Sequence, residues 1–142
     1  MEPLMPPVRD RRTLCVPCLA GIIIMLAMMS CEALETGPDT LDGIWRCQEV
    51  SQTFGNQAYD VTMSYAPNDS TIIRMSNFYN LGAGKVVMAE VDLWELNINA
   101  QNVEGLVFNG TGIVSGNRKK IDFSYTVFDG QSTDVVSATF TR

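Results

Sequence analysis

Residues 121–141 read Ile121-Asp-Phe-Ser-Tyr-Thr-Val-Phe-Asp-Gly-Gln-Ser-Thr-Asp-Val-Val-Ser-Ala-Thr-Phe-Thr141. Apolar side chains occupy every second position in both halves of this stretch, and Asp129-Gly130 lies between the halves. A period of two is that of a β-strand with one buried face. An Asp-Gly pair between two such runs is typical of a tight turn. The stretch therefore predicts a β-hairpin.

The same alternation recurs toward the N-terminus and begins near residue 43. We expect strands near 43–52, 58–66, 70–78, 85–91, 92–99, 104–114, 119–128 and 132–141. Eight short consecutive strands predict an all-β antiparallel meander that closes as a small barrel, with a two-sheet β-sandwich as the alternative. Gly110 and Gly112 favour closure, because glycine inside a strand marks a bend or a close approach of two backbones.

The first 30 residues differ from the rest of the chain. Arg9, Arg11 and Arg12 precede an apolar segment, 19–29, which is too short to span a bilayer as a helix. A positive flank followed by such a segment is typical of a secretory signal peptide. We therefore divide the chain into a cleaved lipoprotein signal peptide (1–30), a polar tether (31–42) and one all-β domain (43–142).

The end of the leader, Ala27-Met-Met-Ser-Cys31, resembles the bacterial lipobox in forms familiar from Bacteroidota. The resemblance implies that Cys31 carries fatty-acyl chains such as palmitate and becomes the new N-terminus. An ordinary secretory signal cut near Ser30 and an uncleaved anchor helix are the alternatives. Because Glu32 rather than Asp follows the cysteine, the expected location is the outer membrane, on its periplasmic face or at the cell surface.

Composition narrows the classes of function. The chain has 16 acidic residues, 10 basic residues and no histidine. An acidic protein repels the phosphate backbone, so we expect no nucleic-acid partner. Without histidine there is no Ser-His-Asp triad, Cys-His pair or imidazole metal site, so we expect a non-enzymatic protein without catalytic residues, metal or cofactor. The sequence Cys15-Val-Pro-Cys18 lies within the predicted signal peptide. Cys47, in the predicted domain, is expected to be a small buried side chain.

Gly43-Ile-Trp45 resembles the Gly-x-Trp opening of the lipocalin and calycin barrels. In those barrels the tryptophan closes one end, and a basic residue near the end of the chain packs on it. The resemblance gives that role to Arg142. The segments 75–78, 99–101, 110–112 and 123–127 resemble small Bacteroidota lipoproteins of lipocalin-like or calycin-like fold.

Two functions remain open. The first is a membrane-anchored, non-catalytic binding module for a small apolar or amphipathic ligand. The side chains that would line its site are Trp45, Tyr59, Met63, Phe78, Trp94, Phe108 and Tyr125. A domain of this size needs the same side chains for its core. The second function is therefore that of a structural or interaction protein of the cell envelope, with a filled barrel. The expected partners are the membrane, through lipidated Cys31, and either a small apolar ligand or an envelope protein.

Overall fold

The computed structural model describes residues 40–142. The predicted signal peptide, Cys31 and most of the predicted tether lie outside these residues. Within 40–142, no helix is long and apolar enough to cross a membrane.

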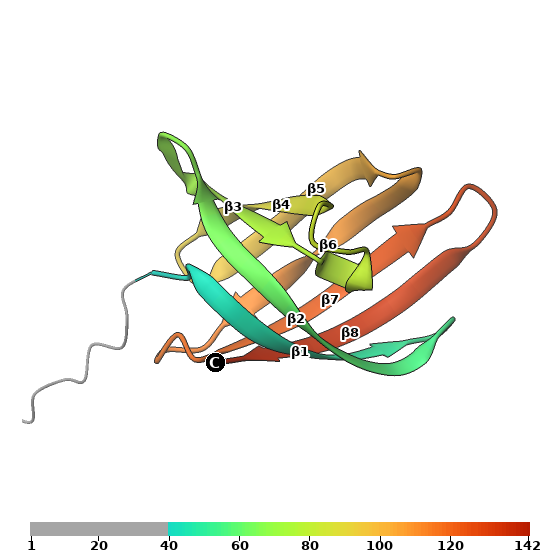
Figure 1. Cartoon of the computed structure of the whole chain (residues 1–142), viewed down its shortest axis with the longest axis horizontal. Coiled ribbons are helices and arrows are strands. Elements are labelled where there is room, and N and C mark those ends of the chain that lie inside the picture. The colour runs from blue at the N-terminus through green and yellow to red at the C-terminus, as the bar shows by residue number, and fades with distance from the viewer. Residues whose placement is uncertain (1–39) are drawn as a thin grey trace, which may run out of the picture. The chain divides into compact units, whose positions relative to one another are not determined.

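Eight strands and one short 3₁₀ helix make up the described part of the chain. They are β1 (Gly43–Ser51), β2 (Gly55–Ala66), β3 (Asp69–Ser76), η1 (Phe78–Asn80), β4 (Val86–Asp92), β5 (Glu95–Val103), β6 (Leu106–Val114), β7 (Lys120–Phe128) and β8 (Thr133–Thr141). Each strand pairs antiparallel with the next, and β8 pairs back onto β1, so the meander is a closed barrel (Figure 1). The predicted all-β barrel is confirmed, and the β-sandwich alternative is wrong.

Alternation of side chains separates the core from the surface. In β7, Ile121, Phe123, Tyr125 and Val127 are buried, while the residues between them face outward. Two glycines on β6 make room for the large rings of β7. A Cβ atom at Gly110 would lie 2.3 Å from the Cβ atom of Tyr125, and one at Gly112 would lie 2.5 Å from the ring of Phe123. These are the close approaches that the glycines in this run predict.

Successive connections along the meander lie at alternate ends of the barrel. We call these ends the Trp45 end and the η1 end. The Trp45 end holds residues 40–42, the turns at 67–68, 93–94 and 115–119, and Arg142. The η1 end holds the turns at 52–54, 104–105 and 129–132, and the connection 77–85 that contains η1. In Figure 1 the C-terminus and the start of β1 lie together toward the left.

A tryptophan and an arginine close the Trp45 end. Trp45 is fully buried, and its Nε1 donates a hydrogen bond to the carbonyl oxygen of Leu41 at 2.9 Å. The guanidinium carbon of Arg142 lies 4.4 Å from the centroid of the indole ring. Arg142 also donates to the carbonyl oxygens of Asp42 at 2.9 Å and Thr40 at 2.6 Å. The predicted contact between the first tryptophan and the last basic residue is thus confirmed.

Candidate functional site

Most of the residues predicted to line a ligand site lie in the barrel core. The buried members of the set are Trp45, Tyr59, Met63, Phe78, Phe108 and Tyr125. Trp94 differs, because it lies in the turn between β4 and β5 and 46% of its surface is exposed. The expectation that a strand over 92–99 carries Trp94 is wrong. The strand predicted over 92–99 is in fact β5, which begins only at Glu95.

Phe78 fills the middle of the barrel. Its ring, carried by η1, is fully buried and lies 4.7–6.2 Å between centroids from four other rings. These rings belong to Phe108, Phe123, Tyr125 and Phe140. Aromatic contacts at these separations are favourable beyond the burial of apolar area alone. The segment before β4 therefore acts as an internal plug of the barrel.

Backbone strain accompanies this plug. Asn77, Tyr79 and Asn80 all have positive φ values, between 56° and 65°. Asn77 supports the bend with its side chain, which donates to the carbonyl oxygen of Asp60 and accepts from the N–H of Gly82, both at 2.8 Å. Conformations of this kind persist where the surrounding structure enforces them. Here burial of Phe78 supplies the enforcing contact.

A polar cluster lies inside the barrel beside the plug. Glu49 is 1% exposed, and its Oε2 atom accepts hydrogen bonds from the hydroxyl groups of Tyr59 and, at 2.5 Å, Tyr125. Its Oε1 atom makes no hydrogen bond within the described part of the chain. Burial is the main cause that raises the pKa of both tyrosine hydroxyls. At neutral pH the tyrosines are therefore hydrogen-bond donors, and they hold the Glu49 carboxyl group in place.

Cys47 belongs to the same cluster and is chemically inert. Burial raises the pKa of its thiol from 9.0 to about 12. The thiolate is the nucleophilic form of cysteine, and it is not populated at neutral pH when the pKa is this high. The prediction that Cys47 is a small buried side chain is confirmed by its complete burial.

The raised pKa values predict a loss of stability in alkali. Because the folded-state pKa of Cys47 exceeds its unfolded value, its contribution is complete below pH 9.0 and is lost as pH rises toward about 12. The raised pKa values of Tyr59 and Tyr125 extend this loss above pH 10.0. Between pH 9.0 and 10.0 we expect the free energy of unfolding, from denaturant titrations, to fall by about 1.4 kcal/mol, because Cys47 is the group that loses its proton only on unfolding there. Above pH 10.0 the fall should be steeper, because the tyrosines add to it. Cys47→Ala should flatten the first part of this slope, and an unchanged slope in that variant would contradict the assignment.

A second group of polar side chains organises the η1 end. Asp134 accepts hydrogen bonds from Ser51 Oγ at 2.5 Å, Tyr79 Oη at 2.7 Å and the N–H of Thr53 at 3.0 Å. Burial opposes ionisation of Asp134, but these hydrogen bonds outweigh it and lower its pKa. The group thus links η1 to the end of β1, to the turn that follows β1 and to the start of β8.

A small cavity opens beside this carboxylate. It measures about 190 Å³ and is lined by Thr53, Phe54, Tyr79, Leu106, Val127, Asp129, Ser132 and Asp134. Apolar side chains supply most of the walls, and Asp134 supplies a negative group whose two oxygens are already hydrogen-bonded. The cavity could hold only a small molecule.

A groove of about 710 Å³ lies on the outer surface of the barrel. Its floor includes a cross-strand row in which Ala58 of β2, Gln48 of β1, Thr139 of β8 and Asp122 of β7 are successive partners. Gln48, Ala58 and Asp122 are exposed. The outward face of the wall therefore forms much of the groove, and its lining also includes the buried residues Glu49, Phe123 and Ala138.

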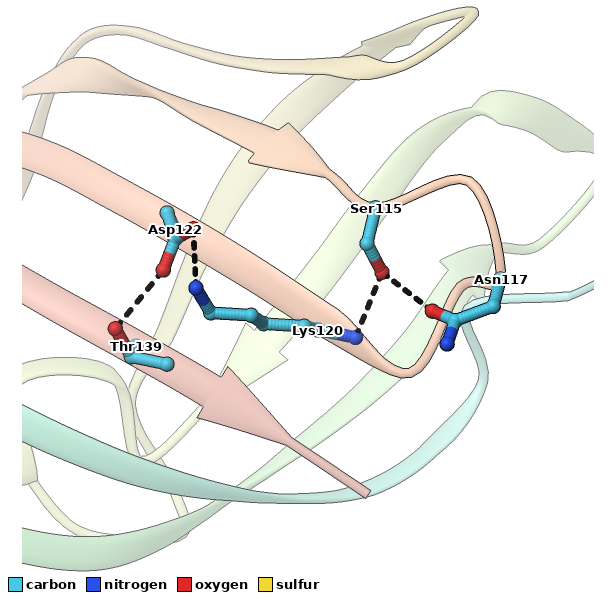
Figure 2. A network of polar contacts seen from close by, with 5 residues as sticks. All are labelled: Ser115, Asn117, Lys120, Asp122 and Thr139. Carbon is cyan, nitrogen blue, oxygen red and sulfur yellow. Dashed lines mark hydrogen bonds and ion pairs between the residues drawn. The ribbon is translucent and has the colours of Figure 1, made fainter.

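Asp122, at one edge of this groove, is held by its neighbours (Figure 2). Lys120 Nζ lies 2.8 Å from Asp122 Oδ2, and Thr139 Oγ1 donates to Asp122 Oδ1 at 2.9 Å. The hydrogen bond from Lys120 is the main cause that lowers the pKa of Asp122. In the adjoining turn, Ser115 Oγ donates to Asn117 Oδ1 at 2.7 Å and accepts from the N–H of Lys120 at 3.1 Å. These contacts stabilise the surface and the turn between β6 and β7.

No protein-family model matches this chain. No curated protein matches it in sequence either. Among solved structures, a redesigned β-barrel is similar, with 12% sequence identity and a TM-score of 0.46. The similarity covers 72% of this chain and 90% of the redesigned barrel.

Sequence reasoning missed the polar residues of the interior and of the η1 end. Glu49 lies at an inward position of β1, between Cys47 and Ser51, and strict alternation from Trp45 already places it inside. That signal was present in the sequence. The partners of Glu49 come from β2 and β7, and no local pattern identifies them.

Proposed function

We propose that this protein is a lipid-anchored, non-catalytic protein of the bacterial cell envelope that acts through the outer surface of a filled barrel. The observation that carries the proposal is the burial of Phe78 among four other rings in the barrel interior. Barrels of eight strands are just wide enough for side chains to fill them or for one small ligand to enter. In this barrel the Phe78 side chain occupies the interior.

The contacts around the plug strengthen this argument. A ligand in the interior would have to displace η1, which would break the hydrogen bond between Tyr79 and Asp134. It would also remove the contacts between the Phe78 ring and its four aromatic neighbours. Buried polar groups that lose their partners destabilise a protein strongly. An interior ligand would need to compensate for all of these losses.

A second candidate function is the binding of a small ligand at the η1 end. The cavity of about 190 Å³ beside Asp134 favours it, because apolar walls next to the carboxylates of Asp129 and Asp134 suit a small molecule with an amino group. The exposed ring of Phe54 and the ring of Tyr79 would cover its apolar part.

Native mass spectrometry of the protein, purified from the envelope of its own host, distinguishes the two functions. The filled barrel predicts the bare mass of the acylated chain. A small-molecule adduct that is lost on denaturation would contradict it. The Asp134→Asn variant then locates any adduct, because a ligand with an amino group at the η1 end should be lost from this variant and an interior apolar ligand should remain.

A further inference from the structure

The turn between β4 and β5 exposes two large apolar side chains at the Trp45 end. Leu93 is 84% exposed and Trp94 is 46% exposed. Ile113 of β6, which pairs with the first residue of β5, is 50% exposed and lies next to this turn. The carbonyl oxygen of Trp94 accepts a hydrogen bond from the N–H of Val114 at 2.8 Å, so the turn is fixed to the barrel wall. We call Leu93, Trp94 and Ile113 the apolar tip.

The backbone of the apolar tip is strained at Leu93. Leu93 has a φ of 51°, in the left-handed region that side chains other than Asn, Asp and Gly rarely adopt. The turn between β5 and β6, at the opposite end, places a glycine at one of its two positive-φ positions. Leucine in this conformation lowers the folding equilibrium constant on the order of tenfold. Local stability therefore does not explain an exposed leucine at this position.

Basic groups lie beside the tip. The guanidinium carbon of Arg118 lies 5.4 Å from the centroid of the Trp94 ring, and Lys119 follows in the same turn. Asp92 and Glu95 flank the tip on its own hairpin, so the surface has both signs of charge around an apolar centre. Tryptophan with arginine or lysine at its rim is typical of surfaces that lie at the headgroup level of a bilayer.

The chain leaves the barrel at this same end. Arg142 donates one hydrogen bond to the carbonyl oxygen of Thr40 and another, at 3.1 Å, to the carbonyl oxygen of Arg118. One arginine thus joins the start of the described chain to the turn whose Arg118 covers Trp94. Only residues 32–39 separate Thr40 from Cys31, and fully extended they reach roughly 30 Å.

We propose that the apolar tip enters the interface of the bilayer that holds the acyl chains of Cys31. In this orientation the Trp45 end of the barrel faces the bilayer, and the η1 end faces away from it. This inference rests on the lipid anchor of the proposed function. The occupant of the surface is lipid, because a short tether at the same end brings the tip to a bilayer without any other partner.

Fluorescence tests this contact in the intact lipoprotein, because the chain has two tryptophans and Trp45 is fully buried. The full chain, acylated by its host, is reconstituted into vesicles of phosphatidylethanolamine and phosphatidylglycerol, with or without brominated acyl chains. We expect the bromine atoms to quench the emission of Trp94, because side chains that enter the interface lie about 5–10 Å deep, at the boundary with the acyl chains. The Trp94→Phe variant reports Trp45 alone and should be unaffected.

Leu93→Asn separates this role from a structural one. Asparagine accepts a positive φ, so this variant should fold with an equilibrium constant equal to or severalfold above that of the natural chain. Lipid quenching of Trp94 should nevertheless fall several-fold, and quenching by aqueous iodide should rise. The control is Phe54→Asn, which removes an exposed ring from the η1 end and should leave both signals unchanged.

The experiment distinguishes an error in the proposed contact between the apolar tip and the bilayer from an error in the proposed acylation of Cys31. If the chain is acylated and sediments with the vesicles but Trp94 is not quenched by lipid, the contact is wrong and the anchor stands. If the emission of Trp94 instead shifts with the density of protein in the membrane, a second copy covers the tip and the proposal is overturned. If the mass of the mature chain shows no acyl group on Cys31, the anchor itself is wrong.

Discussion

Phe78→Ala should destabilise the barrel by about 3–5 kcal/mol, the range found when a large aromatic side chain is removed from a core. The natural ring is fully buried and has four other rings as neighbours, the nearest of which, Tyr125, lies 4.7 Å away between centroids. Alanine would leave a cavity that the wall cannot close, because the pairing of eight strands fixes its diameter. Denaturant titrations of the purified protein measure the loss.

The matched control is Phe54→Ala, which removes the same ring from an exposed position at the η1 end. We expect a change under about 1 kcal/mol there, since 61% of Phe54 is exposed and its ring contact, with Tyr79, is at 6.0 Å. The Phe78→Ala cavity should also bind a small aromatic molecule such as benzene, as apolar cavities do. Equal losses in the two variants would show that the interior is not filled by η1.

Cys31→Ala should move the protein from the membrane to the soluble fraction. Each buried methylene of an acyl chain contributes about 0.8 kcal/mol to membrane binding, so loss of the proposed acyl chains should lower membrane affinity by many orders of magnitude. The apolar tip cannot compensate, because it would place only three side chains, Leu93, Trp94 and Ile113, in the interface. Fractionation of cells, with mass spectrometry of the mature chain, measures both the location and the acyl group.

Cys47→Ala is the control for the loss of a thiol, because Cys47 is buried in the barrel and lies outside the proposed lipidation signal. The Cys47→Ala protein should remain in the membrane fraction. Retention of the Cys31→Ala protein in that fraction would instead indicate an uncleaved anchor helix, one of the alternatives that the leader leaves open.

The periodicity of the sequence predicts which residues of the strands face inward, but it does not predict which of these residues contact one another. Alternation at period two identifies the inward side of β7 and β8 residue by residue, because burial on one face leaves a direct mark on the sequence. The inward position of Glu49 follows from the same rule, although its partners, Tyr59 and Tyr125, come from distant strands. Long-range pairing of this kind has no local signature.

The sequence predicts two residues on strands that the structure places in connections. Alternation predicts Phe78 at the end of a strand over 70–78, but β3 ends at Ser76 and Phe78 lies on η1. An apolar residue that fills a barrel from a connection has the same sequence pattern as an inward residue of a strand. The sequence predicts a strand at Trp94 because the turn Leu93-Trp94 contains no glycine, proline, asparagine or aspartate, the residues on which turn prediction depends.

The pairing of β1 with β8 bears on how such a chain could be exported and folded. Arg46 pairs with Thr141, so the first strand of the barrel cannot find one of its two neighbours until the last strand is available. Contacts between such distant parts of a chain slow folding, because a long loop must close before they form. The barrel of such a chain stays open until β8 is available. Under the export that we propose, the barrel therefore closes only on the far side of the membrane, after β8 has emerged.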